Sequence, residues 1–369
     1  MIIVADNTVP YLKGVAETFA EVRYISSSEF IHENVQDADV LIVRSIDKCT
    51  RELLQNTSIK LITTATIGFD HIDIHYCDEA GIKWTNAPGC NAVSVAQYVL
   101  SSLIITARKT GESLQGKTLG IVGVGHVGTQ LECLARKYGM NVLRNDPPRA
   151  IAEKNDTFVD LDTIAKQSDI ISIHTPFTKE GEYPTYHLAN RTFFQKLEKK
   201  PWFINASRGA VHDTEALLEA KKNGLISEMI IDCWEREPNI NQELLKLTTL
   251  ATPHIAGFSA DGKANGTRMC LEAISRFFNQ KIENIGLVTP LPPVNPVIDL
   301  NFFTGNRIEE AILTSFNPLK TDALLRQSPE KFEWFRSHYD HPREYKAYTV
   351  VNATQEEASL LKKLGFQVQ

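Results

Sequence analysis

Three side chains that could bind a hydroxy acid and take up its hydroxyl proton follow one another in the second half of the chain: Arg208, Glu237 and His254. Each comes shortly after a short apolar run, at the place where an open α/β sheet binds its ligands. Arginine presents a planar fork of donors that fits a carboxylate. Histidine exchanges a proton near neutral pH, and a neighbouring carboxylate stabilises its protonated form. Any one of these residues alone is more often a surface or ion-pair residue, but the three together predict a catalytic site.

A glycine-rich turn, Gly123-Val124-Gly125-His126-Val127-Gly128, follows the apolar run of residues 118–122 and precedes a helical stretch. Gly123 permits the tight turn, Gly125 lets the backbone approach a pyrophosphate, and Gly128 lets the helix pack against the strand. Asp146 follows 146 − 128 = 18 residues later, where a carboxylate would bind the adenosine ribose. This pattern predicts a dinucleotide site and favours NAD over NADP, although Arg149 nearby is an opposite indication.

Two other patterns resemble ligand sites, but their context argues against that function. Gly111 to Thr118 fits the P-loop pattern, yet a helical stretch precedes it and a strand follows, which is the reverse of a true P-loop. His71 and His75 are one helical turn apart, but no third ligand is evident, so we expect no metal. A turn and surface histidines explain these segments better.

Short apolar runs alternate with helical stretches along most of the chain. This alternation predicts a parallel sheet with helices on both faces. Four prolines within residues 289–296 then mark a boundary before a mixed carboxyl-terminal tail. The expected strands are residues 1–5, 39–43, 59–63, 118–122, 141–144, 170–173, 202–205, 229–232, 250–252 and 345–351; the expected helices are residues 92–108, 127–138, 213–222, 262–280, 307–313, 321–325 and 355–364, with residues 9–19 helical or loop.

The composition is that of an ordinary globular protein with two or three domains. The chain has 369 residues, 43% hydrophobic and 23% charged, and its net charge is 39 − 45 = −6. The mild acidity argues against a general nucleic-acid partner, and no apolar run is long enough to cross a membrane. The amino-terminal residues do not resemble a signal peptide. Six cysteines without a Cys-x-x-Cys pair indicate reduced thiols and a cytoplasmic location.

From the amino terminus to about residue 280, the chain resembles the D-isomer-specific 2-hydroxyacid dehydrogenases. The resemblance rests on the order Arg208, Glu237-Pro238 and His254 after the glycine turn, and on the segments Val43-Arg44-Ser45, Thr64 to Asp73 and Asn86 to Ala92. It implies that Arg208 binds the substrate carboxylate, that His254 exchanges the hydroxyl proton and that Glu237 pairs with His254. It further implies NAD contacts at Gly123, Gly125, His126, Val127, Gly128, Asp146, Thr175, Ser207, Asp232 and Gly257, and substrate contacts at Arg44, Ser45, Thr66 and Phe258.

The resemblance also implies an α/β architecture of two doubly wound domains and a small tail. Residues 1–93 and 257–283 would form a flavodoxin-like substrate domain, residues 94–256 an inserted Rossmann domain, and residues 284–369 a carboxyl-terminal α/β dimerisation domain. We expect a homodimer, in which the basic cluster around Arg343 borders the partner subunit's phosphate site.

The segments at Arg44, Thr66 and Asn86, together with the tail, favour the branch that oxidises 4-phospho-D-erythronate to 2-oxo-3-hydroxy-4-phosphobutanoate during pyridoxal phosphate biosynthesis. Phe258 departs from this branch, which commonly has tyrosine there, so one donor to the substrate phosphate would be missing. Two alternatives remain open: a phosphoglycerate or glycerate dehydrogenase, and a non-catalytic NADH-sensing protein like the corepressors of this fold.

Overall fold

The computed structural model describes residues 1–369, which form two compact units. The first unit contains Met1–Asn91 and Ser259–Leu291, and the second contains Ala92–Phe258 and Pro292–Gln369. The chain therefore passes between the two units after Asn91, after Phe258 and after Leu291. Because the tail packs within the second unit, the division into three domains stays a prediction.

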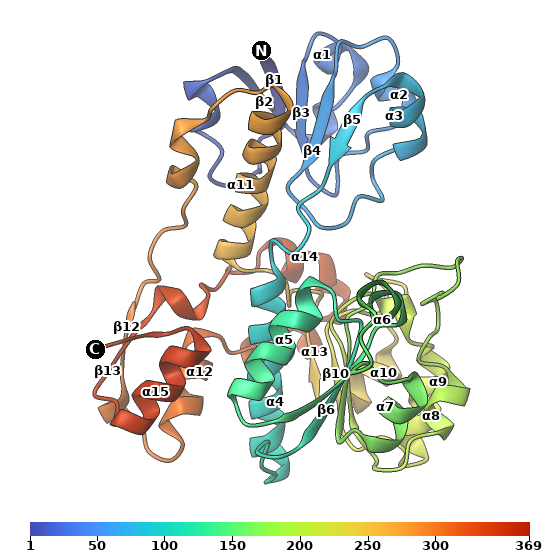
Figure 1. Ribbon diagram of the computed structural model, residues 1–369, viewed down its shortest axis with the longest axis vertical. Helices are drawn as coiled ribbons and strands as arrows, with labels where there is room; N and C mark the ends of the chain where they lie inside the picture. The colour runs from blue at the N-terminus through green and yellow to red at the C-terminus, as the bar shows by residue number, and fades with distance from the viewer. The chain divides into compact units, whose positions relative to one another are not determined.

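The first unit is built on a five-stranded parallel sheet in the order β2-β1-β3-β4-β5 (Figure 1). Alternate side chains face opposite layers: Ile3 and Val40 pack with α11, whereas Val4 and Leu41 pack with α1 to α3. Burial on both faces explains why the central strands are continuous apolar runs. The elements are β1 (Ile2–Asp6), β2 (Glu21–Ile25), α1 (His32–Val35), β3 (Val40–Val43), α2 (Arg51–Leu54), β4 (Leu61–Thr64), α3 (Ile74–Ala80), β5 (Lys83–Thr85) and α11 (Ala260–Phe277).

Strands β2 and β5 were absent from the sequence prediction, and both are edges of this sheet. Residues of β2 are half-buried or exposed, and β5 is three residues long. An edge strand does not need the apolar run that identifies a central strand. Residues 9–19, expected as helix or loop, are mostly turn, with a 3-10 helix at Ala16–Thr18.

The second unit contains a six-stranded parallel sheet in the order β11-β10-β9-β8-β6-β7. Helices α4 and α5 cover one face, and α7 to α10 cover the other. The elements are α4 (Ala92–Thr110), β6 (Thr118–Val122), α5 (His126–Lys137), β7 (Asn141–Asn145), α6 (Pro147–Glu153), α7 (Leu161–Gln167), β8 (Ile170–Ile173), α8 (Arg191–Gln195), β9 (Trp202–Asn205), α9 (Thr214–Lys222), β10 (Met229–Ile231), α10 (Gln242–Leu247) and β11 (Leu250–Ala251).

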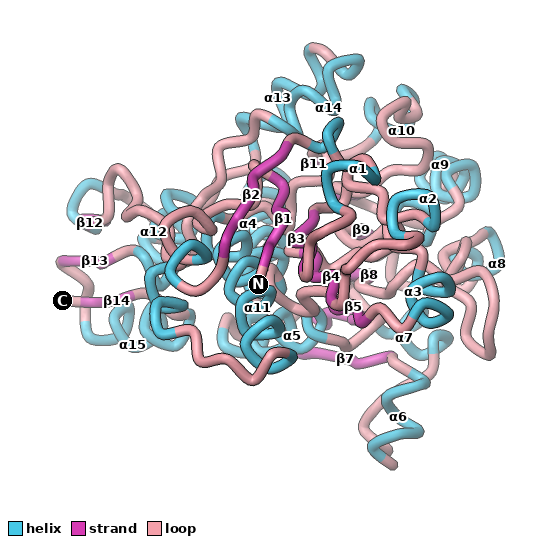
Figure 2. The backbone as a smooth tube through the Cα atoms, turned by 90° about the horizontal axis from the view of Figure 1, so that it is seen from above, coloured by secondary structure: helices cyan, strands magenta, loops and turns pink.

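The tail adds a three-stranded parallel sheet, β12-β13-β14, to the second unit. Strands β13 and β14 lie side by side next to the carboxyl terminus in Figure 2. Tail residues Ile312, Tyr345 and Val350 share one hydrophobic core with α4 and α5. The elements are β12 (Val297–Asp299), α12 (Arg307–Ser315), α13 (Leu319–Gln327), α14 (Phe332–Ser337), β13 (Thr349–Val351), α15 (Gln355–Leu364) and β14 (Gln367–Val368).

The predicted fold class, α/β with two parallel sheets and a small α/β tail, is confirmed. Strands β6, β8 and β9 and helix α15 have the predicted bounds. Helix α15 begins at a capping box of Thr354 and Glu357, and ends at Gly365 in the left-handed conformation. None of the helices is both long and apolar enough to span a bilayer.

Candidate active site

The glycine turn between β6 and α5 has the geometry that a dinucleotide needs. Gly123 has φ +87°, and a Cβ there would lie 2.7 Å from the His174 carbonyl group. A Cβ on Gly128 would lie 2.2 Å from the Gly123 carbonyl oxygen, so only glycine allows this helix to approach the strand. A Cβ on Gly125 would meet nothing within 4 Å, which leaves open space beside the backbone at the start of α5. The turn therefore fits a pyrophosphate.

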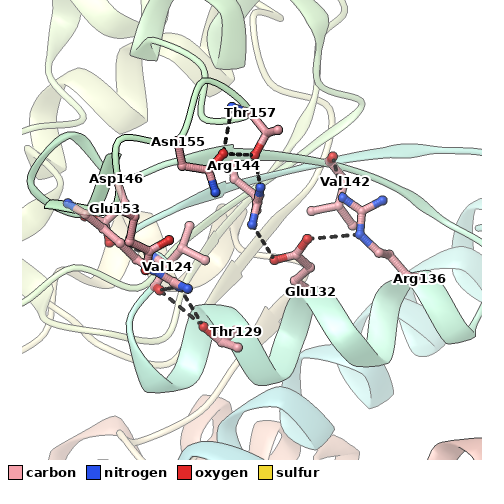
Figure 3. A network of polar contacts seen from close by, with 11 residues as sticks. Val124, Thr129, Glu132, Arg136, Val142, Arg144, Asp146, Glu153, Asn155 and Thr157 are labelled. Atoms are coloured by element: carbon pink, nitrogen blue, oxygen red, sulfur yellow. Dashed lines mark hydrogen bonds and ion pairs between the residues drawn. The ribbon is translucent and has the colours of Figure 1, made fainter. Parts of the chain in front are cut away.

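Asp146, directly after β7, accepts a hydrogen bond from the glycine turn; Figure 3 labels both Asp146 and Val124. Its Oδ2 accepts the Val124 N–H at 2.8 Å, and its Oδ1 accepts the Arg149 N–H at 3.1 Å. The Arg149 guanidinium donates to the Val124 carbonyl and to Thr129 Oγ1, and it pairs with Glu153. Since Arg149 is engaged and paired with a carboxylate, it is poorly placed to receive a 2′-phosphate, which favours NAD.

The other predicted cofactor residues lie on loops that follow the strands of the same sheet. Thr175 lies against Gly123, and its hydroxyl is buried without a hydrogen-bond partner, as expected for a group that a cofactor completes. Ser207 is largely buried, and its hydroxyl donates to Asn205 Oδ1 at 2.9 Å. His126 is exposed and Val127 half-buried at the start of α5, and Gly257 is half-buried in the loop after His254.

Arg208 follows β9 in a loop that Asn205 organises. The Asn205 side chain accepts the Ser207 N–H at 3.1 Å and donates to the Arg208 carbonyl at 2.9 Å. A Cβ on Gly209 would lie only 1.8 Å from the Trp234 carbonyl oxygen. The absence of a side chain at Gly209 thus lets the Arg208 loop lie directly against the loop that leads to Glu237.

His254 and Glu237 form a hydrogen-bonded pair, with Nδ1 of His254 2.8 Å from Oε2 of Glu237. Burial alone would raise the pKa of Glu237, but the hydrogen bond and charge of His254, the Trp234 N–H and the charge of Arg336 outweigh it and lower that pKa. Glu237 is therefore ionised and accepts the Nδ1 proton. This leaves Nε2 of His254 as the nitrogen that can exchange a proton with a substrate.

Asp232 holds the His254 loop from inside the protein. Its carboxylate accepts the N–H groups of Ile255 at 2.8 Å and Ala256 at 3.0 Å, and the Thr252 hydroxyl at 2.7 Å. Burial raises the pKa of Asp232, and the His254 charge and these hydrogen bonds oppose the rise. Asp232 is 1% exposed and holds the backbone that follows His254. Its contact with NAD stays a prediction.

Glu237 and His254 lie around one buried thiol, that of Cys233, and the charge of Arg208 acts on the same thiol. Burial and the charges of Asp232 and Glu237 raise the pKa of Cys233, whereas Arg208 and Arg336 lower it. Ligand atoms of Cys233, Glu237 and His254 lie within 4.8 Å of one another, a spacing that a metal could use. A thiol binds metal as the thiolate, which this environment disfavours, so the expectation of a metal-free site stays as it was.

The predicted substrate residues Arg44, Ser45 and Thr66 lie in the first unit, after β3 and β4. The Arg44 guanidinium donates to Thr8 Oγ1 at 2.6 Å, and the Arg44 N–H donates to Asp47 Oδ2 at 2.7 Å. Ser45 is exposed, and Thr66 is half-buried with its hydroxyl 2.7 Å from that of Thr64.

A second cation of the first unit, Lys263, was not indicated by the sequence. It lies in the first turns of α11, where Gly262 packs against Asn91 and Gly266 packs against the Ala65 carbonyl. Burial and the nearby positive charge of Arg44 lower the pKa of Lys263 to about 8. Arg44 after β3 and Lys263 in α11 are close enough for their charges to interact, and such a pair of cations suits a dianion. No motif marks Lys263, because its place follows only from the packing of α11 on the sheet.

The tail also brings residues to the catalytic loops of the second unit. The Phe258 ring is stacked on His341, with ring centroids 5.8 Å apart, and the Arg336 guanidinium carbon lies 5.6 Å from the centroid of the same ring. Tyr339 is half-buried, and burial and the charge of Asp232 raise its pKa. The sequence placed Phe258 at the site but gave no signal for Arg336.

Two family models match the chain. Residues 95–256 match the D-isomer specific 2-hydroxyacid dehydrogenase, NAD binding domain, and residues 292–365 match a domain of unknown function, DUF3410. Among solved structures, the NAD-bound 3-phosphoglycerate dehydrogenase of Entamoeba histolytica is 27% identical with a TM-score of 0.63, covering 77% of this chain and 97% of its own. The D-lactate dehydrogenase of Aquifex aeolicus, in complex with NAD and lactic acid, is 27% identical with a TM-score of 0.59, covering 79% and 100%.

Several curated relatives match over nearly their full length. The erythronate-4-phosphate dehydrogenase of Porphyromonas gingivalis is 52% identical over 99% of this chain and 100% of its own. The enzymes of the same name from Bacteroides thetaiotaomicron and Escherichia coli are 49% and 37% identical, and cover 95% and 99% of this chain. The similarity therefore includes the tail.

Proposed function

Because the chain belongs to the erythronate-4-phosphate dehydrogenases of the D-isomer-specific 2-hydroxyacid dehydrogenase family, we propose that it oxidises 4-phospho-D-erythronate to 2-oxo-3-hydroxy-4-phosphobutanoate. This reaction is a step toward pyridoxal phosphate. The observation that supports it most directly is the 2.8 Å pair of His254 and Glu237, in the same unit as Arg208 and the glycine turn. An intact pair beside the coenzyme turn speaks against a protein that only senses NADH.

The residues of the second unit divide the work of the oxidation. Arg208 binds the substrate carboxylate and polarises the oxygen on C2. Nε2 of His254 accepts the hydroxyl proton, and ionised Glu237 stabilises the imidazolium that forms. NAD, when bound, supplies the acceptor for the hydride from C2. Gly123, Gly125, His126, Val127, Gly128, Asp146, Thr175, Ser207, Asp232 and Gly257 form the cofactor site or hold it in shape.

The first unit contributes the recognition of the phosphate. Arg44 and Lys263 provide positive charge, and the exposed Ser45 hydroxyl can donate a hydrogen bond. The Thr66 hydroxyl donates to the Gly68 carbonyl at 2.9 Å and would have to turn from it to bind the phosphate. Phe258, which belongs to the second unit, has no hydroxyl and cannot donate to the phosphate. Two cations in the first unit, Arg44 and Lys263, favour a phosphorylated acid over glycerate or lactate.

We further propose a cytoplasmic homodimer that uses no metal. All six cysteines are free, which suits a reducing compartment. Exposed apolar side chains on the tail, including Phe302 and Trp334, are suited to cover by a second copy of the chain.

The test is NADH formation by the purified protein with NAD and a panel of acids: 4-phosphoerythronate, erythronate, 3-phosphoglycerate and D-lactate. We expect the first to be oxidised with the highest kcat/KM. Arg208→Ala should lower kcat/KM by about 100-fold or more, because a charged donor to the reacting acid is lost, while NADH still binds by fluorescence titration. Equal rates with 3-phosphoglycerate, or full activity of Arg208→Ala, would contradict the proposal.

A further inference from the structure

Helix α14 of the tail is packed against the elements that lead to the catalytic loops. Phe332 and Phe335 are buried in the same hydrophobic core as Trp234, Ile231 and Ala251. Trp234 begins the loop that ends at Glu237, and its N–H donates to Glu237 at 2.7 Å. The position of Arg336, directly after Phe335, is therefore fixed relative to the catalytic pair.

The Arg336 side chain contacts the loop of His254, and its charge acts on the loop of Glu237. Its guanidinium carbon lies 5.6 Å from the centroid of the Phe258 ring, within cation–π range, and Phe258 belongs to the loop of His254. Its charge also acts on Glu237 and on Cys233. Nη1 of Arg336 is 3.7 Å from Glu333, beyond hydrogen-bond distance, and Nε is buried without a hydrogen-bond partner. The positive charge is thus not neutralised by a tight ion pair.

We infer that Arg336 is a positioning residue of the catalytic pair: its guanidinium holds the Phe258 ring and places a positive charge beside Glu237. The tail of unknown function thereby takes part in the oxidation within the same chain. The inference rests on the proposed function, because it concerns the catalytic pair. The effect of Arg336 on the protonation of that pair can still be measured without turnover.

The sign of the effect follows from the charges around the pair. The charge of Arg336 acts on Glu237, and the Asp232 carboxyl interacts with the charge of His254. The Cys233 thiol lies beside the pair and feels the charges of Arg208 and Arg336, and the Tyr339 phenol lies near Asp232. The active form of the pair has neutral His254 and ionised Glu237. A neighbouring cation disfavours uptake of a further proton, so removal of the Arg336 charge makes the pair accept a proton at higher pH.

The experiment compares Arg336→Gln, Arg336→Met and Arg336→Lys with Lys331→Gln, which removes an equal charge from an exposed position of the same segment. We expect Arg336→Gln and Arg336→Met to move the acidic limb of the pH profile of kcat/KM to higher pH, by about half a pH unit. Their activity on that limb then falls about threefold. Arg336→Lys and Lys331→Gln should keep the wild-type limb.

The second readout is NMR of histidine-labelled protein, in which the His254 signal is the one missing from His254→Asn. We expect this signal to titrate at higher pH in Arg336→Gln. An unchanged titration and limb, with only KM raised, would overturn the inference in favour of a substrate contact, and an equal shift in Lys331→Gln would also overturn it. If both neutral variants fail to fold while Arg336→Lys folds, Arg336 is structural and the inference fails. Absence of turnover in the wild type would refute the proposed function, and the NMR titration would still decide the inference.

Discussion

His254 adopts a backbone conformation that is costly for a residue with a side chain, with φ +56°. The surrounding hydrogen bonds hold it there: the His254 N–H donates to the Asp232 carbonyl at 2.8 Å, and the Asp232 carboxylate accepts the next two N–H groups. Strain of this kind persists only where neighbouring contacts fix it. The buried Asp232 thus supports the catalytic histidine without touching its ring.

The charge of Lys263 should make the KM for the phosphorylated acid depend on pH. Its pKa is lowered to about 8 by burial and by Arg44, so the side chain is charged below that pH and becomes neutral above it. If it binds the substrate phosphate, KM for the phosphorylated acid should rise as the pH increases from 7 to 9.5. The phosphate itself is already a dianion over most of this range, so it cannot cause the rise.

The matched variant is Lys263→Arg, because arginine stays charged throughout this range. Steady-state kinetics from pH 7 to 9.5 should show a flat KM for Lys263→Arg and a rising KM for the wild type. The same rise in both proteins would show that another group titrates. Unphosphorylated erythronate, measured in parallel, should show no such dependence.

At the scale of elements, helix α13 of the tail closes the open edge of the coenzyme sheet. Asp322 accepts the N–H of Ala251 in the edge strand β11 at 2.7 Å. Arg326 pairs with Asp322 and donates to the carbonyls of Leu245 and Thr248, both at 2.7 Å. An uncovered edge presents unpaired backbone groups and invites aggregation, and this helix removes that edge.

Asp322→Ala should therefore destabilise the second unit by about 1–3 kcal/mol, because the Ala251 N–H and Arg326 both lose their acceptor. Thermal unfolding should move several degrees lower, and the Ala251 amide should exchange with solvent faster. Asp322→Asn keeps one acceptor oxygen, so it should lose less stability than Asp322→Ala. Asp162→Ala removes an exposed ion pair with Lys196 and should change little. Equal effects of Asp322→Ala and Asp162→Ala would refute a special role for the edge contact.

Features encoded by a short stretch of sequence could be predicted, whereas features that depend on packing between distant segments could not. Central strands such as β8 and β9 are buried on both faces, so their composition identifies them, whereas the edge strands β2 and β5 do not have this signal. The glycine turn and the order Arg208, Glu237 and His254 are local motifs, and the family assignment followed from them. Lys263 and Arg336 could not be predicted, because packing between segments distant in the chain brings them to the sites.

The same packing predicts how the molecule responds to cleavage between Leu291 and Val297, a linker with exposed side chains at Leu291 and Val294. Tail residues Ile312 and Tyr345 are fully buried in one core with α4 and α5. After cleavage at an inserted protease site, the tail should therefore stay bound and elute with the rest of the protein in size-exclusion chromatography. Ile312→Asp, which puts a charge into that core, should release the tail after cleavage but not before it. Separation of the unmutated fragments, with the coenzyme unit still binding NADH, would show that the tail is an independent domain and not part of the coenzyme unit's core.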